Sequence, residues 1–248
     1  MRLKDKVAII TGGSTGIGYA ITEAYLREGA KVVIASYDKK EIEDAIDTLC
    51  EKYDKENIFG VTCNVKNTSD IKEVVQKTIE KYNRIDILIN NAGITNSGPT
   101  ESVTDEDFEN MFEVNTFGVF KFIREVIPYM KKQGQGSIIN TSSMVANDGS
   151  RMQTAYTASK YAVNGITKAC AKELGAYGIR VNAVAPGAVL TNMVKKATTE
   201  EMRQMLCKTC ALGKIAEPKE LAGAYVYLGS DEASYTTGSI VRVDGGPF

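Results

Sequence analysis

Seven short apolar runs alternate along the chain with longer segments of helical periodicity, and this alternation limits the possible folds most strongly. Several runs are apolar on consecutive residues, which is typical of parallel strands covered on both faces. The sequence therefore predicts an α/β fold with a doubly wound, seven-stranded parallel sheet flanked by helices on both faces. The predicted strands are Lys6 to Thr11, Lys31 to Ala35, Ile58 to Cys63, Ile85 to Ile89, Ser137 to Thr141, Arg180 to Ala185 and Ser239 to Val243. The predicted helices cover residues 17–28, 39–53, 68–82, 104–132, 153–177 and 217–229.

The composition fits one folded domain over residues 1–248. Hydrophobic residues make up 43% of the chain and charged residues 25%, a balance that allows a large core. No repeat, low-complexity tract or Pro-rich linker divides the chain. The one long irregular segment, about residues 186–216, follows the carboxyl end of a predicted strand, so we expect a substrate lid at about 187–216.

Charge and hydropathy exclude several kinds of partner. The 30 basic and 31 acidic residues leave a formal net charge of -1, so no broad positive field exists for a nucleic acid or an anionic membrane. The first apolar run is too short for a secretory signal, and no stretch reaches the length of a membrane span. We therefore expect a cytoplasmic protein with reduced cysteines and with no nucleic-acid or membrane partner.

The chain contains no histidine, which restricts its chemistry more than any other number. Ser-His-Asp and Cys-His nucleophiles, HExxH zinc sites and histidine bases are all excluded. Cys207 and Cys210 form the only CxxC motif. Without a second pair they lack four zinc ligands, so we interpret them as thiols on a helix and predict no metal. Acid/base chemistry must then use Tyr, Lys, Cys or a carboxylate.

A glycine-rich turn, Thr11 to Gly18, separates the first strand from the first helix, where helix N-terminal amides meet a phosphate. Gly12 lets the chain turn, Gly16 permits close backbone approach and Gly18 allows tight packing. The spacing is TGxxxGxG instead of GxGxxG, and alone such a turn can be structural. Asn90 to Gly93 follows the fourth strand at the same carboxyl edge. Together the two segments predict a Rossmann-type nucleotide site.

Tyr156 and Lys160 are four residues apart, so on a helix their side chains lie on one face. A free phenol has a pKa near ~10, and a neighbouring cation or an oxidised nicotinamide ring lowers it. Ser143 ends a strand, where its hydroxyl can hold a substrate oxygen beside Tyr156. Asn115 lies within a predicted helix, a position that Asn disfavours. Singly these residues fit a surface pair, a helix cap and a local backbone contact, but jointly they favour an active site.

In order and spacing these motifs closely resemble those of short-chain dehydrogenases/reductases, over essentially the whole chain. The matching motifs are Thr11-Gly12 with Gly16-Ile17-Gly18, Asn90-Asn91-Ala92-Gly93, Asn115, Ser143, Tyr156-Thr157-Ala158-Ser159-Lys160, Pro186-Gly187 and Val243-Asp244-Gly245-Gly246. The resemblance implies an NAD(P)-dependent oxidoreductase that interconverts a carbonyl and a secondary alcohol. It also implies a homotetramer with interfaces on the helices at 104–132 and 153–177 and on the C-terminal strand.

The resemblance implies a catalytic tetrad of Asn115, Ser143, Tyr156 and Lys160. In it Asn115 supports a water that links Lys160 to solvent, Lys160 holds the nicotinamide ribose, and Tyr156 gives the proton while the nicotinamide gives hydride. The cofactor contacts implied are Gly12, Ser14, Thr15, Gly16, Ile17, Gly18, Ser36, Tyr37, Asn64, Val65, Asn91, Ala92, Gly93, Tyr156, Lys160, Pro186, Gly187, Val189 and Thr191. The substrate contacts expected are Ser143, Val145, Gln153 and Tyr156.

Two departures from the family pattern concern the cofactor. Asn64 stands where many relatives carry Asp, and its amide can still bond the adenine amino group. Ser36 occupies the position where NAD users place an acid on the ribose 2′-OH, so no carboxylate there repels a 2′-phosphate. Lys39 or Lys40 could bind that phosphate, whereas Asp38 could turn inward. We favour NADP(H), with NAD(H) as the alternative.

The substrate is less constrained. A Met-rich lid suits a bulky apolar carbonyl, although the methionines can equally pack the lid itself. Gln153 resembles the 3-oxoacyl-acyl-carrier-protein reductases, but Tyr177 stands where those carry an arginine that grips the acidic carrier. A hydroxysteroid or another apolar secondary alcohol is therefore the alternative. From a different class, the chain could be a catalytically dead nucleotide-sensing module, which the intact tetrad disfavours.

Overall fold

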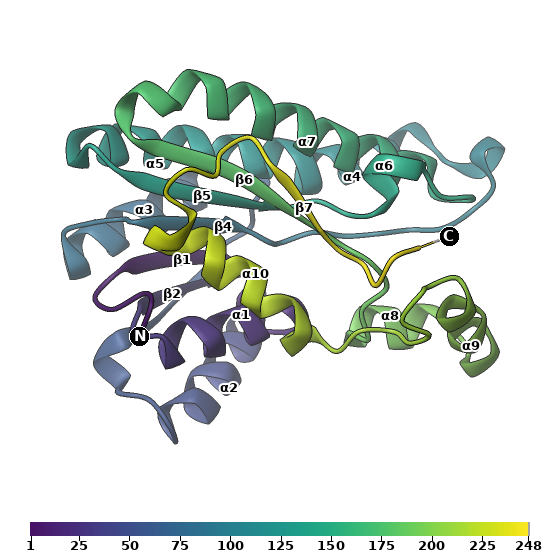
Figure 1. Ribbon diagram of the computed structural model, residues 1–248, viewed down its shortest axis with the longest axis horizontal. Coiled ribbons are helices and arrows are strands. Elements are labelled where there is room, and N and C mark those ends of the chain that lie inside the picture. The colour runs from purple at the N-terminus through teal and green to yellow at the C-terminus, as the bar shows by residue number, and fades with distance from the viewer. Residues whose placement is uncertain (248) are drawn as a thin grey trace.

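Seven parallel strands form one sheet in the computed structural model, which describes residues 1–247 except the side chains of residues 193, 196 and 197. The strand order is β3-β2-β1-β4-β5-β6-β7 (Figure 1). This confirms the predicted doubly wound parallel sheet. The strands are β1 (Val7–Thr11), β2 (Lys31–Ser36), β3 (Ile58–Thr62), β4 (Ile87–Asn90), β5 (Gly136–Thr141), β6 (Ile179–Pro186) and β7 (Ile240–Val243).

Helices cover both faces of the sheet. The helices are α1 (Gly16–Arg27), α2 (Lys39–Cys50), α3 (Thr68–Tyr82), α4 (Asp105–Phe112), α5 (Gly118–Gln133), α6 (Val145–Asp148), α7 (Thr154–Leu174), α8 (Asn192–Ala197), α9 (Glu200–Lys208) and α10 (Pro218–Gly229). Buried side chains of α1, α2 and α10 pack in one core cluster, and those of α3, α5 and α7 pack in the other. Within β1, Ile10 belongs to the first cluster and Ile9 to the second. Consecutive residues thus face opposite apolar layers, which explains the uninterrupted apolar runs.

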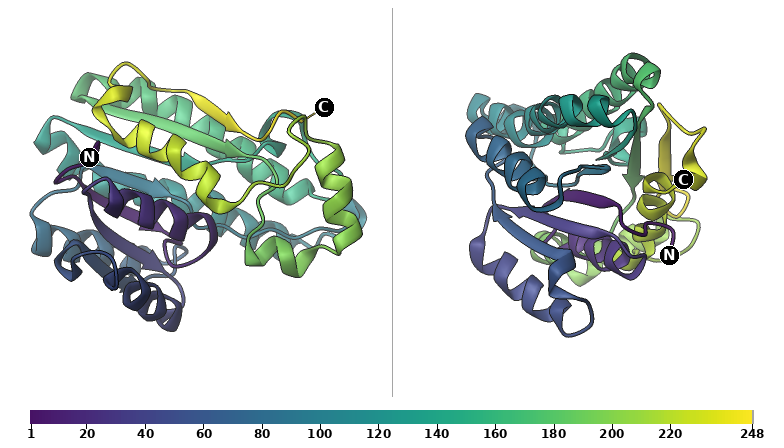
Figure 2. Two further views of the ribbon diagram at one scale, coloured as in Figure 1. Left: turned by 60° about the horizontal axis from the view of Figure 1, so that its bottom comes forward. Right: turned by 90° about the vertical axis from the view of Figure 1, so that its left-hand side faces the viewer.

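Two predicted segments differ from the structure. The single helix predicted at 104–132 is two α-helices joined by a π-helical turn, Glu113–Phe117. The segment 186–216, predicted as irregular, contains α8 and α9, which project beyond the sheet (Figure 2). Thr191 and Thr199 cap these helices through their hydroxyl groups. No residue of α9 is buried, because most of its residues are polar and its apolar side chains stay exposed.

None of the helices within residues 1–247 is both long and apolar enough to cross a membrane.

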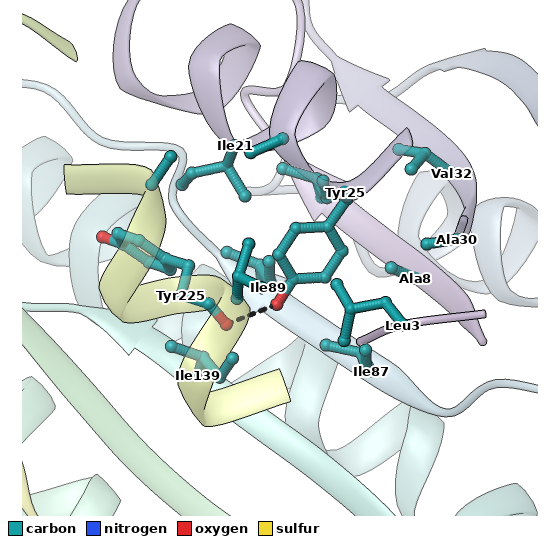
Figure 3. Packing of buried hydrophobic residues seen from close by; sticks show 14 of the residues in the cluster. Leu3, Ala8, Ile21, Tyr25, Ala30, Val32, Ile87, Ile89, Ile139 and Tyr225 are labelled. Atoms are coloured by element: carbon teal, nitrogen blue, oxygen red, sulfur yellow. Dashed lines mark hydrogen bonds between the residues drawn. The ribbon is translucent and has the colours of Figure 1, made fainter. Parts of the chain in front are cut away.

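A pair of tyrosines ties α1 to α10 (Figure 3). The fully buried Tyr25 hydroxyl donates to the Tyr225 carbonyl oxygen at 2.7 Å. The Tyr225 hydroxyl in turn shares a hydrogen bond of 2.8 Å with the Thr141 hydroxyl at the end of β5. Gly229 closes α10 directly against Tyr25, where a Cβ atom would overlap the phenolic oxygen.

Two glycine substitutions in α10 should therefore have opposite effects. Gly229→Ala should lower the free energy of unfolding by about 1–3 kcal/mol, because the methyl group displaces the Tyr25 hydroxyl from its buried carbonyl partner. Gly223→Ala, whose Cβ meets nothing within 4 Å, should raise it by about 0.5–1 kcal/mol. Denaturant unfolding of both variants checks this, and equal effects would contradict it.

Candidate active site

Polar side chains gather where the central strands end. The Thr11 hydroxyl, at the end of β1, accepts hydrogen bonds from the backbone N–H groups of Asn91 and Ala92, both at 2.9 Å. The Asn91 side chain donates to the Thr11 carbonyl at 3.1 Å. These bonds fix the segment after β4 against the glycine-rich turn. Thr11 was not predicted as a site residue, although a polar residue that ends an apolar strand is a readable signal.

The glycine-rich turn leaves a cradle that suits a dinucleotide. Gly12 and Gly16 have φ of +63° and +56°, which favours glycine, and α1 begins at Gly16 with its N-terminal amides at this edge. A Cβ on Gly18 would overlap the Gly12 carbonyl oxygen, so the packing role predicted for Gly18 holds. A Cβ on Gly16 would lie 3.3 Å from Thr191 Cγ2, so the turn faces the segment after β6. Ser14 is buried in the turn, whereas Thr15 is exposed and Ile17 packs against the core.

The end of β2 contacts the turn directly. Ser36 is buried, and its hydroxyl oxygen accepts from the Ser14 backbone N–H at 3.3 Å and from the Ser14 hydroxyl at 3.0 Å. Tyr37 is 76% exposed. Asp38 does not turn inward but caps α2, accepting from the backbone N–H groups of Lys40 and Glu41. The position next to the turn therefore carries a hydroxyl group and no carboxylate.

Asn64 and Val65 follow β3 as predicted, close to the start of α5. Asn64 Oδ1 accepts from the Lys66 backbone N–H at 3.0 Å. The Asn64 backbone N–H donates to the Asp70 carboxylate, also at 3.0 Å. Val65 lies against Gly118, where a Cβ would come within 3.1 Å of it. These contacts place Asn64 in a fixed turn at the carboxyl edge of the sheet.

Tyr156 and Lys160 lie together on α7, as their spacing predicted. The Lys160 Nζ atom is 5.8 Å from the centre of the Tyr156 ring, and the Ser143 hydroxyl lies near enough to the Tyr156 phenol to lower its pKa. Lys160 is buried and donates to the Thr141 carbonyl oxygen at 2.8 Å. Ser143 follows β5, and the last residue of β5, Thr141, holds the lysine, which brings three of the four predicted catalytic residues into one cluster.

Asn115 completes the cluster through the π-helical turn. A Cβ on Gly93 would lie 3.2 Å from Asn115 Oδ1 and 3.6 Å from Lys160 Nζ, so the segment after β4 packs closely on both side chains. The Asn115 side chain accepts from the Ile94 N–H and donates to the Ile94 carbonyl, both at 2.9 Å, and also donates to Ser159. Asn115, which a helix disfavours, therefore satisfies the backbone N–H and carbonyl of Ile94. Its role toward a water stays a prediction.

Burial shifts the acidity of the two α7 groups. It lowers the pKa of Lys160 to about 8. Burial also raises the pKa of Tyr156, an effect that the hydrogen bond from Ser143 opposes. The expectation that Lys160 lowers the Tyr156 pKa is therefore wrong for the protein alone. The Lys160 ammonium is directed at the Thr141 carbonyl, and loss of solvent around the phenolate outweighs its influence.

The remaining predicted residues line the same edge or support it. The Met144 N–H donates to the Pro186 carbonyl at 2.8 Å, and Val189 is buried. Gly187 packs on the Asp244 backbone, where a Cβ would come within 2.7 Å of Cα, so its glycine is required by the C-terminal segment. Val145 is buried, and Gln153 Nε2 lies 3.5 Å from the hydroxyls of Thr95 and Ser97.

A buried asparagine network beneath the site was not predicted. Asn90 donates to Asn140 at 2.9 Å, Asn140 donates to Thr167 at 2.9 Å, and Ser142 donates to Asn164 at 2.7 Å. These bonds lock the ends of β4 and β5 to α7, which carries Tyr156 and Lys160. The visible signal is the run of polar residues at the end of β5.

Known proteins match the chain over nearly its full length. A family model described as enoyl-(acyl carrier protein) reductase matches residues 12–247. The chain is 43% identical to a 3-oxoacyl-acyl-carrier-protein reductase of Thermotoga maritima, over 99% of both chains. It is 41% identical to a 3alpha-hydroxysteroid dehydrogenase of Mediterraneibacter gnavus, over 99% of this chain and 98% of the relative. The crystal structure of a Brucella melitensis 3-ketoacyl-(acyl-carrier-protein) reductase complexed with NADH covers 98% of both chains, with a TM-score of 0.92 and 33% identity.

The chain belongs to the short-chain dehydrogenase/reductase family. It is an oxidoreductase that uses a nicotinamide cofactor and acts on CH–OH groups. The dead-module alternative finds no support in these relatives.

The depressed pKa of Lys160 predicts a measurable pH effect on stability. Between the folded value of about 8 and the higher unfolded value, the unfolded chain binds the proton more tightly, so stability rises with pH in that window. The unfolding free energy of wild type minus that of Lys160→Met should increase by on the order of 2 kcal/mol from about pH 7.5 to pH 10. Chemical denaturation at both pH values measures this difference, and a constant difference would refute the buried, desolvated ammonium.

Proposed function

We propose that the protein reduces a carbonyl to a secondary alcohol, reversibly, with Tyr156 as the proton donor and Ser143 as the partner that holds the substrate oxygen. The clustering of Ser143, Tyr156 and Lys160 carries this proposal, because it brings two hydroxyl groups and a buried cation to one place. A bound reduced nicotinamide supplies the hydride. The site fits that group, since the glycine-rich cradle and Thr191 face each other at the same edge.

The electrostatics of the site suit this direction of reaction. A raised Tyr156 pKa keeps the phenol protonated at neutral pH, ready to give its proton to the oxygen that gains negative charge. Lys160, with its pKa near neutral, can pass a proton toward the tyrosinate that results. In the reverse direction, the positive charge of an oxidised nicotinamide favours the phenolate that must accept the proton.

Tyr156→Phe should lower turnover by at least ~100-fold while leaving the fold and cofactor binding intact, because it removes only the proton donor. Tyr161→Phe, one turn along α7, removes a hydroxyl that bonds the Asn147 backbone and should keep turnover close to that of wild type. Absorbance of NAD(P)H with a panel of carbonyl substrates measures both. Wild-type turnover in Tyr156→Phe would reject the assignment.

We propose NADP(H) as the preferred cofactor, with no metal. The position beside the turn carries the Ser36 hydroxyl, and the Asp38 carboxylate is held at the start of α2. The ribose 2′ position thus meets no carboxylate that would repel a phosphate. The NADH bound to the Brucella relative keeps NAD(H) as the alternative.

Ser36→Asp should shift the ratio of kcat/KM for NADP(H) over NAD(H) by at least ~10-fold toward NAD(H), about 1.4 kcal/mol, through repulsion of the 2′-phosphate. Ser36→Ala serves as the control, since it removes the bond to Ser14 without adding charge. Steady-state kinetics with both cofactors gives the ratio. An unchanged ratio in Ser36→Asp would place the 2′ position elsewhere.

For the substrate we propose a 3-oxoacyl thioester, in line with the names of several relatives. A hydroxysteroid is the second candidate, favoured by α9. Its side chains Met202, Met205 and Leu206 are all exposed and form one apolar stripe at helical spacing. Tyr177 stands at the position where the acyl-carrier-protein reductases carry an arginine. Its ring lies 3.8 Å from the Lys131 ammonium, so this lysine is engaged in a cation–π contact.

The remaining proposals concern organisation. We propose that residues 1–248 act as one domain, with 187–216 as the substrate lid, since α8 and α9 project past the sheet edge. A homotetramer is supported by the exposed aromatic rings of Phe108, Phe117 and Phe120 around α4 and α5. We also propose a cytoplasmic location, in keeping with five free thiols, and small-molecule substrates as partners, without nucleic acid or membrane, in keeping with the net charge of -1.

A further inference from the structure

The CxxC motif sits at the point where the lid segment joins the body of the protein. Cys207 lies in the last turn of α9, as predicted for a helical thiol, but Cys210 lies beyond the helix and forms an isolated β-bridge with Pro247. The Cys210 N–H donates to the Cys207 carbonyl at 3.3 Å and so closes a turn between them. Across such a turn the Cα atoms lie within about 7 Å, which includes the range that disulfides span.

Cys210 anchors α9, which buries no residue of its own. Its thiol donates to the Gly245 carbonyl at 3.1 Å, and a Cβ on Gly245 would overlap the sulfur atom. The next two residues continue the contact, because the N–H groups of Ala211 and Leu212 donate to the carbonyls of Gly246 and Gly245 at 2.8 and 3.1 Å. The position of the Cys210 sulfur is therefore coupled to the attachment of the lid.

Cys207 is accessible from a hollow of about 600 Å³ between α8, α9 and the segment at Ile215. Lys195 lines the same hollow, whereas Arg203 is ion-paired there with Glu200 at 2.9 Å, so among the described lining residues Lys195 supplies the unbalanced charge. Both cysteines are partly exposed, whereas Cys63 is buried. The hollow thus offers a thiol to a small reagent and, by its charge, favours an anionic one.

We propose that Cys207 and Cys210 are a reversible redox site, oxidised to a disulfide by an anionic low-molecular-weight disulfide such as glutathione disulfide. The Cys207 thiolate attacks one sulfur of the oxidant, forms a mixed disulfide and releases one glutathione. The Cys210 thiolate then attacks Cys207 sulfur and releases the second glutathione. The two protein thiols lose two electrons and two protons, and both pass to the two glutathione molecules.

Oxidation moves the Cys210 sulfur away from the Gly245 carbonyl and loosens the anchor of α9. The effect on catalysis rests on the proposed lid function, and a looser lid raises KM for the carbonyl substrate more than it changes kcat. Disulfide formation itself does not depend on that function. The two parts can therefore be tested separately.

The test exposes the full-length protein to glutathione disulfide and maps its peptides by mass spectrometry. We expect a Cys207–Cys210 link in wild type and in the control Cys170→Ser, and a stable glutathione adduct on Cys207 in Cys210→Ser. Lys195→Met should slow the reaction with glutathione disulfide but not with the neutral hydroxyethyl disulfide. Absence of the link in wild type overturns the proposed site. So does a result in which Lys195→Met reacts as fast as wild type with both reagents.

Hydrogen exchange and kinetics test the coupling to the lid. In the oxidised protein the amides of Ala211 and Leu212 should exchange faster, and KM should rise several-fold and return on treatment with dithiothreitol. A linked protein with unchanged exchange and KM overturns the coupling. Activity of the reduced protein, measured in parallel, shows whether the proposed function stands regardless of this result.

Discussion

The Lys160 ammonium is buried beneath the carboxyl edge of the sheet, and the arrangement of the site depends on how this charge is stabilised. A charge removed from water needs compensation, and here the Thr141 carbonyl accepts a hydrogen bond from it at 2.8 Å. That carbonyl is available only because β5 ends at Thr141, in register with its neighbours β4 and β6. Gly93 packs beside it, where a Cβ would already be in van der Waals contact with the Nζ atom at 3.6 Å. Strand register and this close packing thus define where the charge lies.

Sequence reasoning succeeded where chemistry and periodicity coincide. Tyr156 and Lys160 are four residues apart on a helix, and helical geometry alone places them together. The apolar runs predicted the sheet because each strand faces two apolar layers, as Ile9 and Ile10 illustrate. The glycine-rich turn could be predicted because Gly18 is required sterically: a Cβ there would overlap the Gly12 carbonyl oxygen.

The failures have equally physical causes. The π-helical turn at Asn115 adds no signal to the apolar period, so one long helix was predicted for 104–132. The helix α9 was missed because it is short and mostly polar, so its few apolar residues gave a weak helical pattern. The Tyr156 acidity was misjudged because spacing reports which groups are neighbours, whereas the pKa also depends on how much water each has lost. Thr11 and the asparagine network are marked in the sequence only as polar residues at strand ends, and their partners are set by tertiary contacts.

The two core tyrosines, Tyr25 and Tyr225, connect to the candidate site through hydrogen bonds as well as packing in the core. Tyr25 holds the Tyr225 carbonyl, the Tyr225 hydroxyl holds the Thr141 hydroxyl, and the carbonyl of that same threonine holds Lys160. A continuous series of contacts therefore connects the α1–α10 contact to the buried lysine of the candidate site. A substitution at Tyr25, on the side of the sheet away from α7, is thereby separated from Lys160 by only two intervening residues, Tyr225 and Thr141.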